Sequence, residues 1–410
     1  MVGLRKRAAP SSEPVTHEGH EGTTLEMPAR RALTTLGIAT TATVVGVLPP
    51  FLMGGLSVFM GPDLGFDESG LGLAVSLFFA LASVLSVPAG RLGDRLGARR
   101  TLRLGMLASM VSLGGIGAVS QSWTGLVVFL AVGAVGNALS QMAGNVMIMT
   151  STPYRRQAMS FAVKQSSAPF ATLAGGAAVP LVGLTVGWRW AFIASALLCL
   201  LLVVPLPPGK PPAPSAPGAV ARGPLLLLAA AAACAAAAAN SSGAFLVPAL
   251  TSQGMDPGPA GGVLALGGAI AIASRMVGGW AGDRYGMDGL LASCLLVGAG
   301  AVGFAAMAFQ PRGAVLAITV LLMFGGGWGF NGLLIFAVVR RHPHAPGTAT
   351  GMTQTGVFAG GVFGPLIFAF AATSFGYRTA WAVLALVALV ATACFASGRA
   401  LLYRTQAAGA

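Results

Sequence analysis

Two short charged strings in this chain are nearly the same, and the distance between them constrains the fold more than any other feature. Residues 90–100 read GRLGDRLGARR and residues 279–286 read GWAGDRYG, which places Asp94 and Asp283 189 residues apart. The same offset recurs downstream in four further pairs: Gln165 and Gln354, Gly187 and Gly376, Arg189 and Arg378, and Ala191 and Ala380. One spacing that holds across most of both halves predicts a duplicated unit.

The sequence around these strings is too apolar for a water-soluble protein. Hydrophobic residues make up 55% of the 410 residues and charged residues only 9%, whereas soluble domains carry about a quarter of charged residues. The mean hydropathy is +0.79. Residues 32–206 and 224–403 are two apolar blocks, each long enough for six helices of about 20 residues. The run Leu225–Ala239 is apolar on every face, which excludes the alternating strands of a membrane β-barrel.

The predicted fold is therefore an all-α integral membrane protein with twelve transmembrane helices in two six-helix bundles. The expected spans of the first bundle are 32–56, 69–90, 101–120, 124–150, 157–182 and 188–206. Those of the second bundle are 224–250, 259–281, 289–309, 313–339, 346–373 and 378–400. The other segments are a polar tail at 1–31, a proline-rich linker at 207–223 and a short tail at 404–410.

Basic residues are distributed unevenly over the predicted loops. If the N-terminus is cytoplasmic, nineteen of the 24 Lys and Arg fall in cytoplasmic segments, and only Arg189, Arg312 and Arg378 fall in loops on the other side. This asymmetry predicts a multi-pass protein of the cell membrane with both termini in the cytoplasm. It also accounts for the net charge of +13, because a nucleic-acid protein would gather its cations on one soluble face. The expected partners are the lipid bilayer and a small molecule, with no nucleic acid, and the expected state is a monomer.

The first charged string resembles the signature loop between helices 2 and 3 of the major facilitator superfamily, which reads approximately G-x-L-A/G-D-R-x-G-R-R/K. Asp94, Arg95, Gly97 and Arg100 match this pattern, and Ala98 departs from it where the family usually has Arg. The second string stands in the place of the weaker copy between helices 8 and 9. The resemblance also covers the six-plus-six topology and the linker. It implies a secondary transporter that rocks two bundles around a central site.

The charged strings also have a physical interpretation as a gate. An aspartate beside arginines at the membrane edge can form charge-assisted hydrogen bonds and can face a helix N-terminus. Such contacts would close one side of the transporter and break when that side opens. The predicted gating residues are Gly90, Asp94, Arg95, Gly97, Arg100, Asp283 and Arg284. The alternative is that the arginines only determine topology, a role that needs no aspartate.

Ionisable residues are rare inside the predicted spans. None of the eleven Asp and Glu lies deep in a span, whereas Lys164 and Arg275 each lie about seven residues inside one. A buried charge without a partner costs free energy, and an anionic substrate would supply the missing partner. The resemblance implies that helices 5 and 8, which carry these two cations, meet at the interface between the bundles. The alternative is that both side chains extend back to the cytoplasmic surface.

The position of Arg275, eight residues before Asp283, is similar to that of the substrate-contacting arginine on helix 8 of monocarboxylate and oxalate/formate transporters. Lys164 does not match those families. Together with the charge argument, this resemblance makes a small organic anion such as a carboxylate the expected substrate.

Neutral polar residues supply further candidates for substrate binding. Asn137, Gln141 and Asn145 stand at four-residue spacing, which places them on one stripe of a helix. Such a stripe near mid-membrane faces either a water-filled cavity or a neighbouring helix to which it bonds. The remaining candidates are the repeat pair and two asparagines of the second half: Gln165, Gln354, Asn240 and Asn331.

A second class of substrate stays open. The alanine-rich spans would also suit a drug or secondary-metabolite exporter for neutral amphiphiles, although drug-exporting members carry Gly-Pro where this chain has Ala168-Pro169. No nucleophile motif or shared cluster of His, Cys and Asp indicates an enzyme, and no cofactor is expected. The four cysteines lie in different spans, and the tail segment His17–Glu21 lacks the spacing of a metal motif, so no metal site is predicted.

Overall fold

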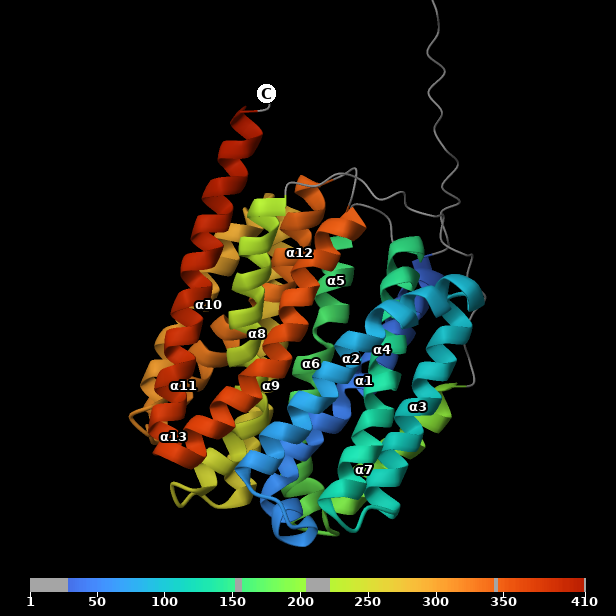
Figure 1. Cartoon of the computed structure of the whole chain (residues 1–410), viewed down its shortest axis with the longest axis vertical. Coiled ribbons are helices and arrows are strands. Elements are labelled where there is room, and N and C mark those ends of the chain that lie inside the picture. The colour runs from blue at the N-terminus through green and yellow to red at the C-terminus, as the bar shows by residue number, and fades with distance from the viewer. Residues whose placement is uncertain (1–28, 152–156, 204–221, 343–345, 409–410) are drawn as a thin grey trace, which may run out of the picture.

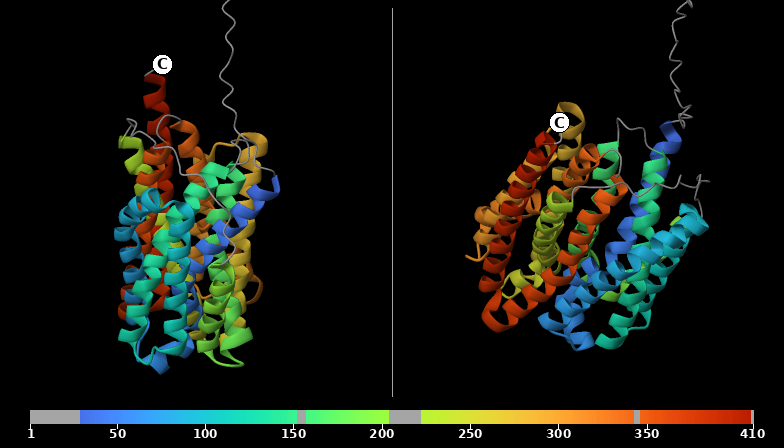
Figure 2. Two further views of the ribbon diagram at one scale, coloured as in Figure 1. Left: turned by 90° about the vertical axis from the view of Figure 1, so that its right-hand side faces the viewer. Right: turned by 45° about the horizontal axis from the view of Figure 1, so that its top comes forward.

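A computed structural model of the chain describes residues 29–151, 157–203, 222–342 and 346–408. Predictions that fall on the polar tail and on most of the linker lie outside these residues. Within the described ranges the secondary structure is helical, with short turns between the helices (Figure 1). The helices lie alongside one another, and α1 begins at the same end of the bundle at which α13 ends (Figures 1 and 2).

The first half contributes six passes. They are α1 (Ala29–Leu64), α2 (Glu68–Leu96), α3 (Ala98–Ala118), α4 (Trp123–Ser151), a divided fifth pass made of α5 (Gln157–Gln165), α6 (Ser167–Ala178) and the π-helical turn η2 (Val179–Gly183), and α7 (Trp188–Val203).

The second half repeats this plan. Its passes are α8 (Arg222–Thr251), α9 (Pro257–Tyr285), α10 (Gly289–Met307), a divided tenth pass made of α11 (Gly313–Val320), the π-helical turn η3 (Leu321–Gly326) and α12 (Phe330–Arg341), and the two passes within α13 (Pro346–Ala408). The last two passes join at Gly376, where φ is 84° and the chain reverses direction (Figure 1).

The predicted fold class, a twelve-helix membrane protein, is confirmed. Nine described helical stretches, one of which contains both passes of α13, are long and apolar enough to cross a membrane. The divided fifth pass and the short α7 complete the twelve passes. The main departure from the predicted spans is the interruption of the fifth pass between Gln165 and Ser167. Pro169 has no N–H to donate to the carbonyl of Gln165 four residues earlier, so the helical ladder breaks there.

The 189-residue offset reappears in the backbone geometry. Positive φ angles occur at three pairs of glycines with this offset: Gly65 (72°) and Gly254 (87°), Gly97 (79°) and Gly286 (60°), and Gly187 (95°) and Gly376 (84°). Each pair sits in corresponding turns of the two halves, where a residue with a Cβ would be strained. Asp67 and Asp256, also 189 residues apart, occupy the N-cap positions of α2 and α9.

The two halves pack backbone against backbone at the end of the bundle where α2 and α9 begin. A Cβ added at Gly176 in α6 would lie 2.6 Å from the carbonyl oxygen of Gly261 in α9. One added at Gly54 in α1 would lie 2.7 Å from Ala244 Cα in α8. Glycine permits such close approach between membrane helices. The halves therefore touch through their backbones near this end, which is called the opposite end below.

The other end is called the basic end, because it carries exposed arginines in the last turns of α2 and α9 and in the first turn of α3. These arginines are Arg95, Arg100 and Arg284. Figure 2 shows the helices of the first half, in blue to green, beside those of the second half, in yellow to red. The candidate site lies between these two groups of helices.

Candidate substrate-binding site

A cavity of about 550 Å³ lies between the two halves. Residues of α1, α2, α4, α5 and α6 line it from the first half, and residues of α8, α9, α12, the turn before α12, and α13 line it from the second half. Seven side-chain carboxamides contribute to its wall: Asn137, Gln141, Asn145, Gln165, Asn240, Asn331 and Gln354. All seven were singled out in the sequence, and the fold brings them to one place. Their role in binding remains a prediction.

The stripe on α4 explains why three of these residues meet. Asn137, Gln141 and Asn145 lie one turn apart and all three line the cavity. The repeat pair Gln165 and Gln354 reaches the same cavity from α5 and α13, because corresponding helices of the two halves face each other across it. The volume lies within the usual range for small-molecule sites.

Three of the carboxamide oxygens in the cavity wall are buried without a hydrogen-bond partner among the described residues. They are Oδ1 of Asn137, Oδ1 of Asn331 and Oε1 of Gln354. By contrast, Nδ2 of Asn240 donates to the carbonyl of Ala236 at 2.9 Å. Buried polar atoms are nearly always paired in folded proteins, so these three acceptors mark places where a donor from a ligand or from water is missing. They belong to cavity residues of both halves.

Aromatic side chains form much of the remaining wall, and the sequence did not single them out. They are Phe79, Phe161, Trp328, Phe330 and Phe358. Trp328 is held in place by stacking on Phe324, with ring centroids 5.7 Å apart, and by a 3.1 Å hydrogen bond from its Nε1 to Ser242 Oγ. Aromatic residues in apolar spans look alike whether they face lipid or a cavity, so only the packing of the helices distinguishes the two.

Arg275 of α9 lines the cavity and is buried, with 6% of its surface exposed. Its Nε donates to the carbonyl of Trp328 at 2.8 Å, and its Nη1 donates to the carbonyl of Gln165. Arg275 therefore has hydrogen-bond partners that its sequence context did not indicate, although neither of them carries a negative charge. The alternative, that Arg275 extends to the surface, does not hold either.

Both carbonyls are available because the helices that carry them are broken. Pro169 has no N–H that could donate to the Gln165 carbonyl. Trp328 lies in the turn between η3 and α12. Gln165 belongs to the first half and Trp328 to the second. The guanidinium of Arg275 thus links the two halves at the cavity wall.

Lys164 of α5 is buried, with 1% of its surface exposed, and is not among the residues that line the cavity. Its Nζ donates to Oε1 of Gln141, a cavity residue of α4. A Cβ added at Gly144 of α4 would lie 3.7 Å from its Cε. The expectation that Lys164 joins Arg275 as a second charge in one anion site is therefore corrected: Lys164 turns toward α4 within the first half.

The second copy of the charged string makes a contact between the halves. Asp283 near the end of α9 accepts a 3.2 Å hydrogen bond from the backbone N–H of Met159, in the first turn of α5. A carboxylate at a helix N-terminus is favourable, because it satisfies a free N–H and faces the positive end of the dipole. This contact joins the two halves at the basic end.

The other predicted gating residues frame the turns beside these helices. Gly97 joins α2 to α3, Gly90 lies in the last turns of α2, and Arg95, Arg100 and Arg284 are exposed. The side chain of Asp94 lies outside the described part of the structure. The gating role of all these residues remains a prediction.

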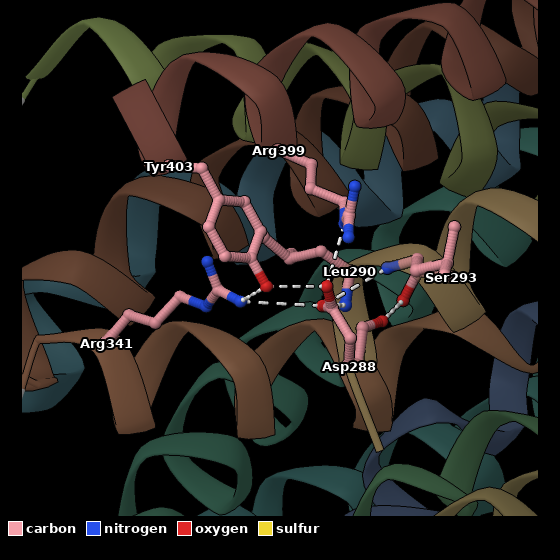
Figure 3. A network of polar contacts seen from close by, with 8 residues as sticks. Asp288, Leu290, Ser293, Arg341, Arg399 and Tyr403 are labelled. Atoms are coloured by element: carbon pink, nitrogen blue, oxygen red, sulfur yellow. Dashed lines mark hydrogen bonds and ion pairs between the residues drawn. The ribbon is translucent and has the colours of Figure 1, made fainter. Parts of the chain in front are cut away.

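A polar network at the basic end was not recognised in the sequence (Figure 3). Asp288, the N-cap of α10, accepts hydrogen bonds from Arg399 Nε at 2.7 Å and from Tyr403 Oη at 2.9 Å, both on α13. Arg341 of α12 lies 3.6 Å from the same carboxylate. The network joins α10, α12 and α13. In the sequence its arginines indicate topology only.

Burial opposes ionisation of Asp288, but the hydrogen bonds from Arg399, Tyr403 and the amides of Leu291 and Leu290 outweigh it. The pKa of this carboxyl is therefore held below its usual value.

Comparisons with known proteins agree with this architecture. Residues 32–365 match the sequence profile of the Major Facilitator Superfamily. A chloramphenicol resistance protein of Streptomyces lividans is 28% identical over 365 residues, which cover 84% of this chain and 91% of that protein. The crystal structure of a bacterial homologue of the human lysosomal transporter Spinster, in an inward-facing and occupied conformation, superposes with a TM-score of 0.69 at 17% identity. The match covers 91% of this chain and 97% of that chain, and it shows that the two share a fold.

Proposed function

We propose a substrate class and a binding site for this chain, which belongs to the major facilitator superfamily and is a multi-pass membrane transporter of small molecules. The proposed substrate is a neutral amphiphile that carries hydrogen-bond donors, and the proposed site is the cavity between the two halves. Transport proceeds by alternating access, in which the halves rock around the bound molecule.

The observation that carries this proposal is the set of unpaired carboxamide oxygens of Asn137, Asn331 and Gln354. They accept hydrogen bonds, so the matching groups on a substrate are hydroxyl or amide donors. The aromatic wall around Trp328 and Phe330 suits an apolar ring. A molecule with one apolar end and several donors satisfies both parts of the wall.

Charge favours the same class. The described residues that line the cavity include no acid, so a cationic substrate would find no counter-charge there and would face Arg275. Two of the five N–H donors of Arg275 already bind carbonyls, so part of its hydrogen-bonding capacity is used without an anion. The similarity to the chloramphenicol resistance protein supports the proposal, because chloramphenicol is a neutral amphiphile with hydroxyl and amide donors. Export of such a molecule is the proposed direction.

A small organic anion is the second candidate, and one observation favours it. The carbonyl partners of Arg275 do not neutralise its charge, and no acid does so among the described lining residues. A carboxylate bound there would pair with the guanidinium. Asn137, Gln141 and Asn145 would then hold the remaining polar edge of the anion.

Polar contacts between the halves at each end provide the proposed gates. At the basic end Asp283 accepts from the Met159 amide. At the opposite end the hydroxyl of Tyr377 in α13 donates to Glu68 of α2 at 3.2 Å. Opening toward one side breaks one contact while the other holds. Asp94 is proposed to act at the basic end as Asp283 does, by virtue of the repeat.

We place the protein in the cell membrane with both termini in the cytoplasm, because basic residues gather at the end where α1 begins and α13 ends. In this orientation the basic end faces the cytoplasm, and the proline-rich segment 207–223 connects the halves on that side. A monomer is the proposed unit of transport, since each chain contains both halves of the cavity.

Ligand binding to the purified full-length chain tests the proposed substrate class. Chloramphenicol is expected to raise the melting temperature, whereas oxalate, lactate and tetraphenylphosphonium are expected to have little effect. Asn331→Leu should weaken chloramphenicol binding about 2- to 13-fold, since a lost hydrogen bond costs about 0.5–1.5 kcal/mol. Gln121→Leu, on an exposed turn, is the matched control. Stabilisation by the carboxylates alone would support the organic-anion candidate and overturn the neutral one.

A further inference from the structure

The amine of Lys164 is a buried ionisable group that has no role in the transport cycle proposed above. Its Nζ has a single hydrogen-bond partner among the described residues, Oε1 of Gln141. An ammonium carries three donors, so two remain unsatisfied in a setting that is closed to bulk solvent. An ammonium held in this way is costly.

The helices packed against α5 offer it no acid at its own depth. α4 and α6 carry no ionisable residue. On α1 the ionisable residues are Arg30, Arg31 and Asp63, on α9 they are Arg275, Asp283, Arg284 and Tyr285, and on α12 they are Arg340 and Arg341. Asp283 binds the amide of Met159, five residues before Lys164, which corresponds to about 7.5 Å of helix. Arg275 binds the carbonyl of the next residue and is itself a cation.

The repeat shows that the fold does not require a cation at this position. Gln165 and Gln354 correspond to each other, but the residue before Gln354 is Thr353. Thr353 is fully buried, and its hydroxyl donates to the carbonyl of Thr350 at 3.0 Å. At the equivalent place the second half therefore has a small side chain whose hydroxyl forms its hydrogen bond within its own helix. Lys164 is a departure from the duplicated plan.

We propose that Lys164 is the proton-carrying group of the transport cycle, which couples export of the substrate to entry of a proton; this inference rests on the proposed function. In the empty transporter Lys164 is an ammonium that donates to Gln141. A substrate that fills the cavity donates to the Gln141 oxygen in its place. The ammonium then loses its acceptor, and it releases one proton to water.

The cycle closes when the substrate leaves and the Gln141 oxygen is free to accept from Lys164 again. The neutral amine takes one proton from water on the side to which the cavity then opens. Gln141 is the physical link between the two events, because its side chain both lines the cavity and accepts from Lys164. A buried lysine suits this task, since its amine changes protonation state with its surroundings, whereas arginine stays charged.

Calorimetry of chloramphenicol binding to the purified full-length chain tests the proposal. Titrations at one pH in phosphate and in Tris, which differ in ionisation enthalpy, give the number of protons released per bound molecule. The wild type is expected to release up to one proton. Lys164→Met and Lys164→Arg are expected to bind with no proton release, and Lys164→His to restore part of it. Lys210→Met, in the proline-rich segment, is the control that removes a lysine without altering the release.

The substitutions separate proton transfer from a structural role of the charge. If only a positive charge were needed, Lys164→Arg would behave as the wild type, and that result would overturn the proposal. Because Lys164→Arg keeps the charge and nearly the length of the side chain, it tests the proposal even where Lys164→Met fails to fold. Binding with unchanged proton release in Lys164→Met overturns the coupling role and leaves the proposed substrate class intact. Binding of oxalate but not chloramphenicol overturns the substrate class, and the coupling inference falls with it.

Discussion

Arg275 links the two halves of the molecule because each of its partners is a carbonyl that a broken helix leaves free. Pro169 exposes the Gln165 carbonyl, and the turn before α12 exposes that of Trp328. A single guanidinium reaches both because its donors form a rigid planar fork. This cation thus connects the two sides of the cavity wall by hydrogen bonds.

Arg275→Lys is expected to destabilise the protein although it keeps the charge. A lysine presents a point charge and cannot reproduce the planar fork that binds the two carbonyls. Loss of one charged hydrogen bond costs about 1.5–3 kcal/mol, which corresponds to a fall of several degrees in the melting temperature. Thermal unfolding in detergent measures this effect. Arg404→Lys, at an exposed position near the end of α13, serves as the control. Equal melting temperatures for wild type and Arg275→Lys would contradict the linking role.

Asp288 makes a second prediction at this scale, because its pKa is depressed in the folded state. Burial works against ionisation, but hydrogen bonds from Arg399, Tyr403 and two amides prevail. A depressed carboxyl pKa contributes stability that is present above the unfolded value of about 3.9 and is lost as the pH falls through the folded value.

Asp288→Asn is therefore expected to lower the melting temperature at pH 7. The difference from the wild type should stay constant down to about pH 5 and shrink below about pH 4. Asp256→Asn is a matched control, since Asp256 is also an N-cap but its side chain accepts no capping hydrogen bond. Melting curves from pH 3 to pH 8 test this, and a pH-independent difference would show that the ionised carboxylate is not what stabilises the network.

At the scale of helices, the molecule is divided into a closely packed end and a hollow centre. Where α6 meets α9 the packing is backbone to backbone through Gly176 and Gly261. Where α4, α12 and α13 face one another, carboxamides and aromatic rings surround the cavity. Small residues therefore decide where the halves touch, and larger polar residues decide where they stay apart.

Gly176→Ala tests this division. The added methyl group would lie 2.6 Å from the Gly261 carbonyl oxygen, and this contact with backbone can be relieved only by moving α9. Overpacking of this kind typically costs about 1–3 kcal/mol, so a lower melting temperature and impaired chloramphenicol transport in proteoliposomes are expected. Gly262→Ala, where an added methyl meets nothing within 4 Å, should behave as the wild type. Similar losses in both variants would argue against a specific contact at Gly176.

At the scale of the whole molecule, the duplicated plan determines which turns share an end. The exposed turns that carry Arg100 and Arg284 lie at the basic end, and those that carry Asp67 and Asp256 lie at the opposite end. The proposed orientation places the basic end in the cytoplasm.

Cysteine labelling of intact cells tests this orientation. In a background without the four native cysteines, cysteines at Asp67 and Asp256 should react with an impermeant maleimide added from outside. Cysteines at Arg100 and Arg284 should react only after the membrane is permeabilised. The unmodified cysteine-free chain is the control, and the reverse pattern would invert the proposed topology.

The sequence alone determined the duplication, the number of passes and the residues of the polar stripe on α4. These features are periodic or local: the 189-residue offset, the length of each apolar run and the four-residue spacing of Asn137, Gln141 and Asn145 can all be read along one dimension. The structure adds that Gly65 and Gly254, which have the same offset, both adopt positive φ angles.

Only the tertiary structure decided the partners. Arg275 binds carbonyls 110 and 53 residues away, Asp288 binds side chains 111 and 115 residues away, and Lys164 turns toward Gln141 rather than toward Arg275. Such contacts depend on which face of a helix meets which neighbour, and on carbonyls that a helix break sets free. Composition and spacing carry neither kind of information, because a side chain's chemistry is the same whether it faces lipid, a cavity or another helix.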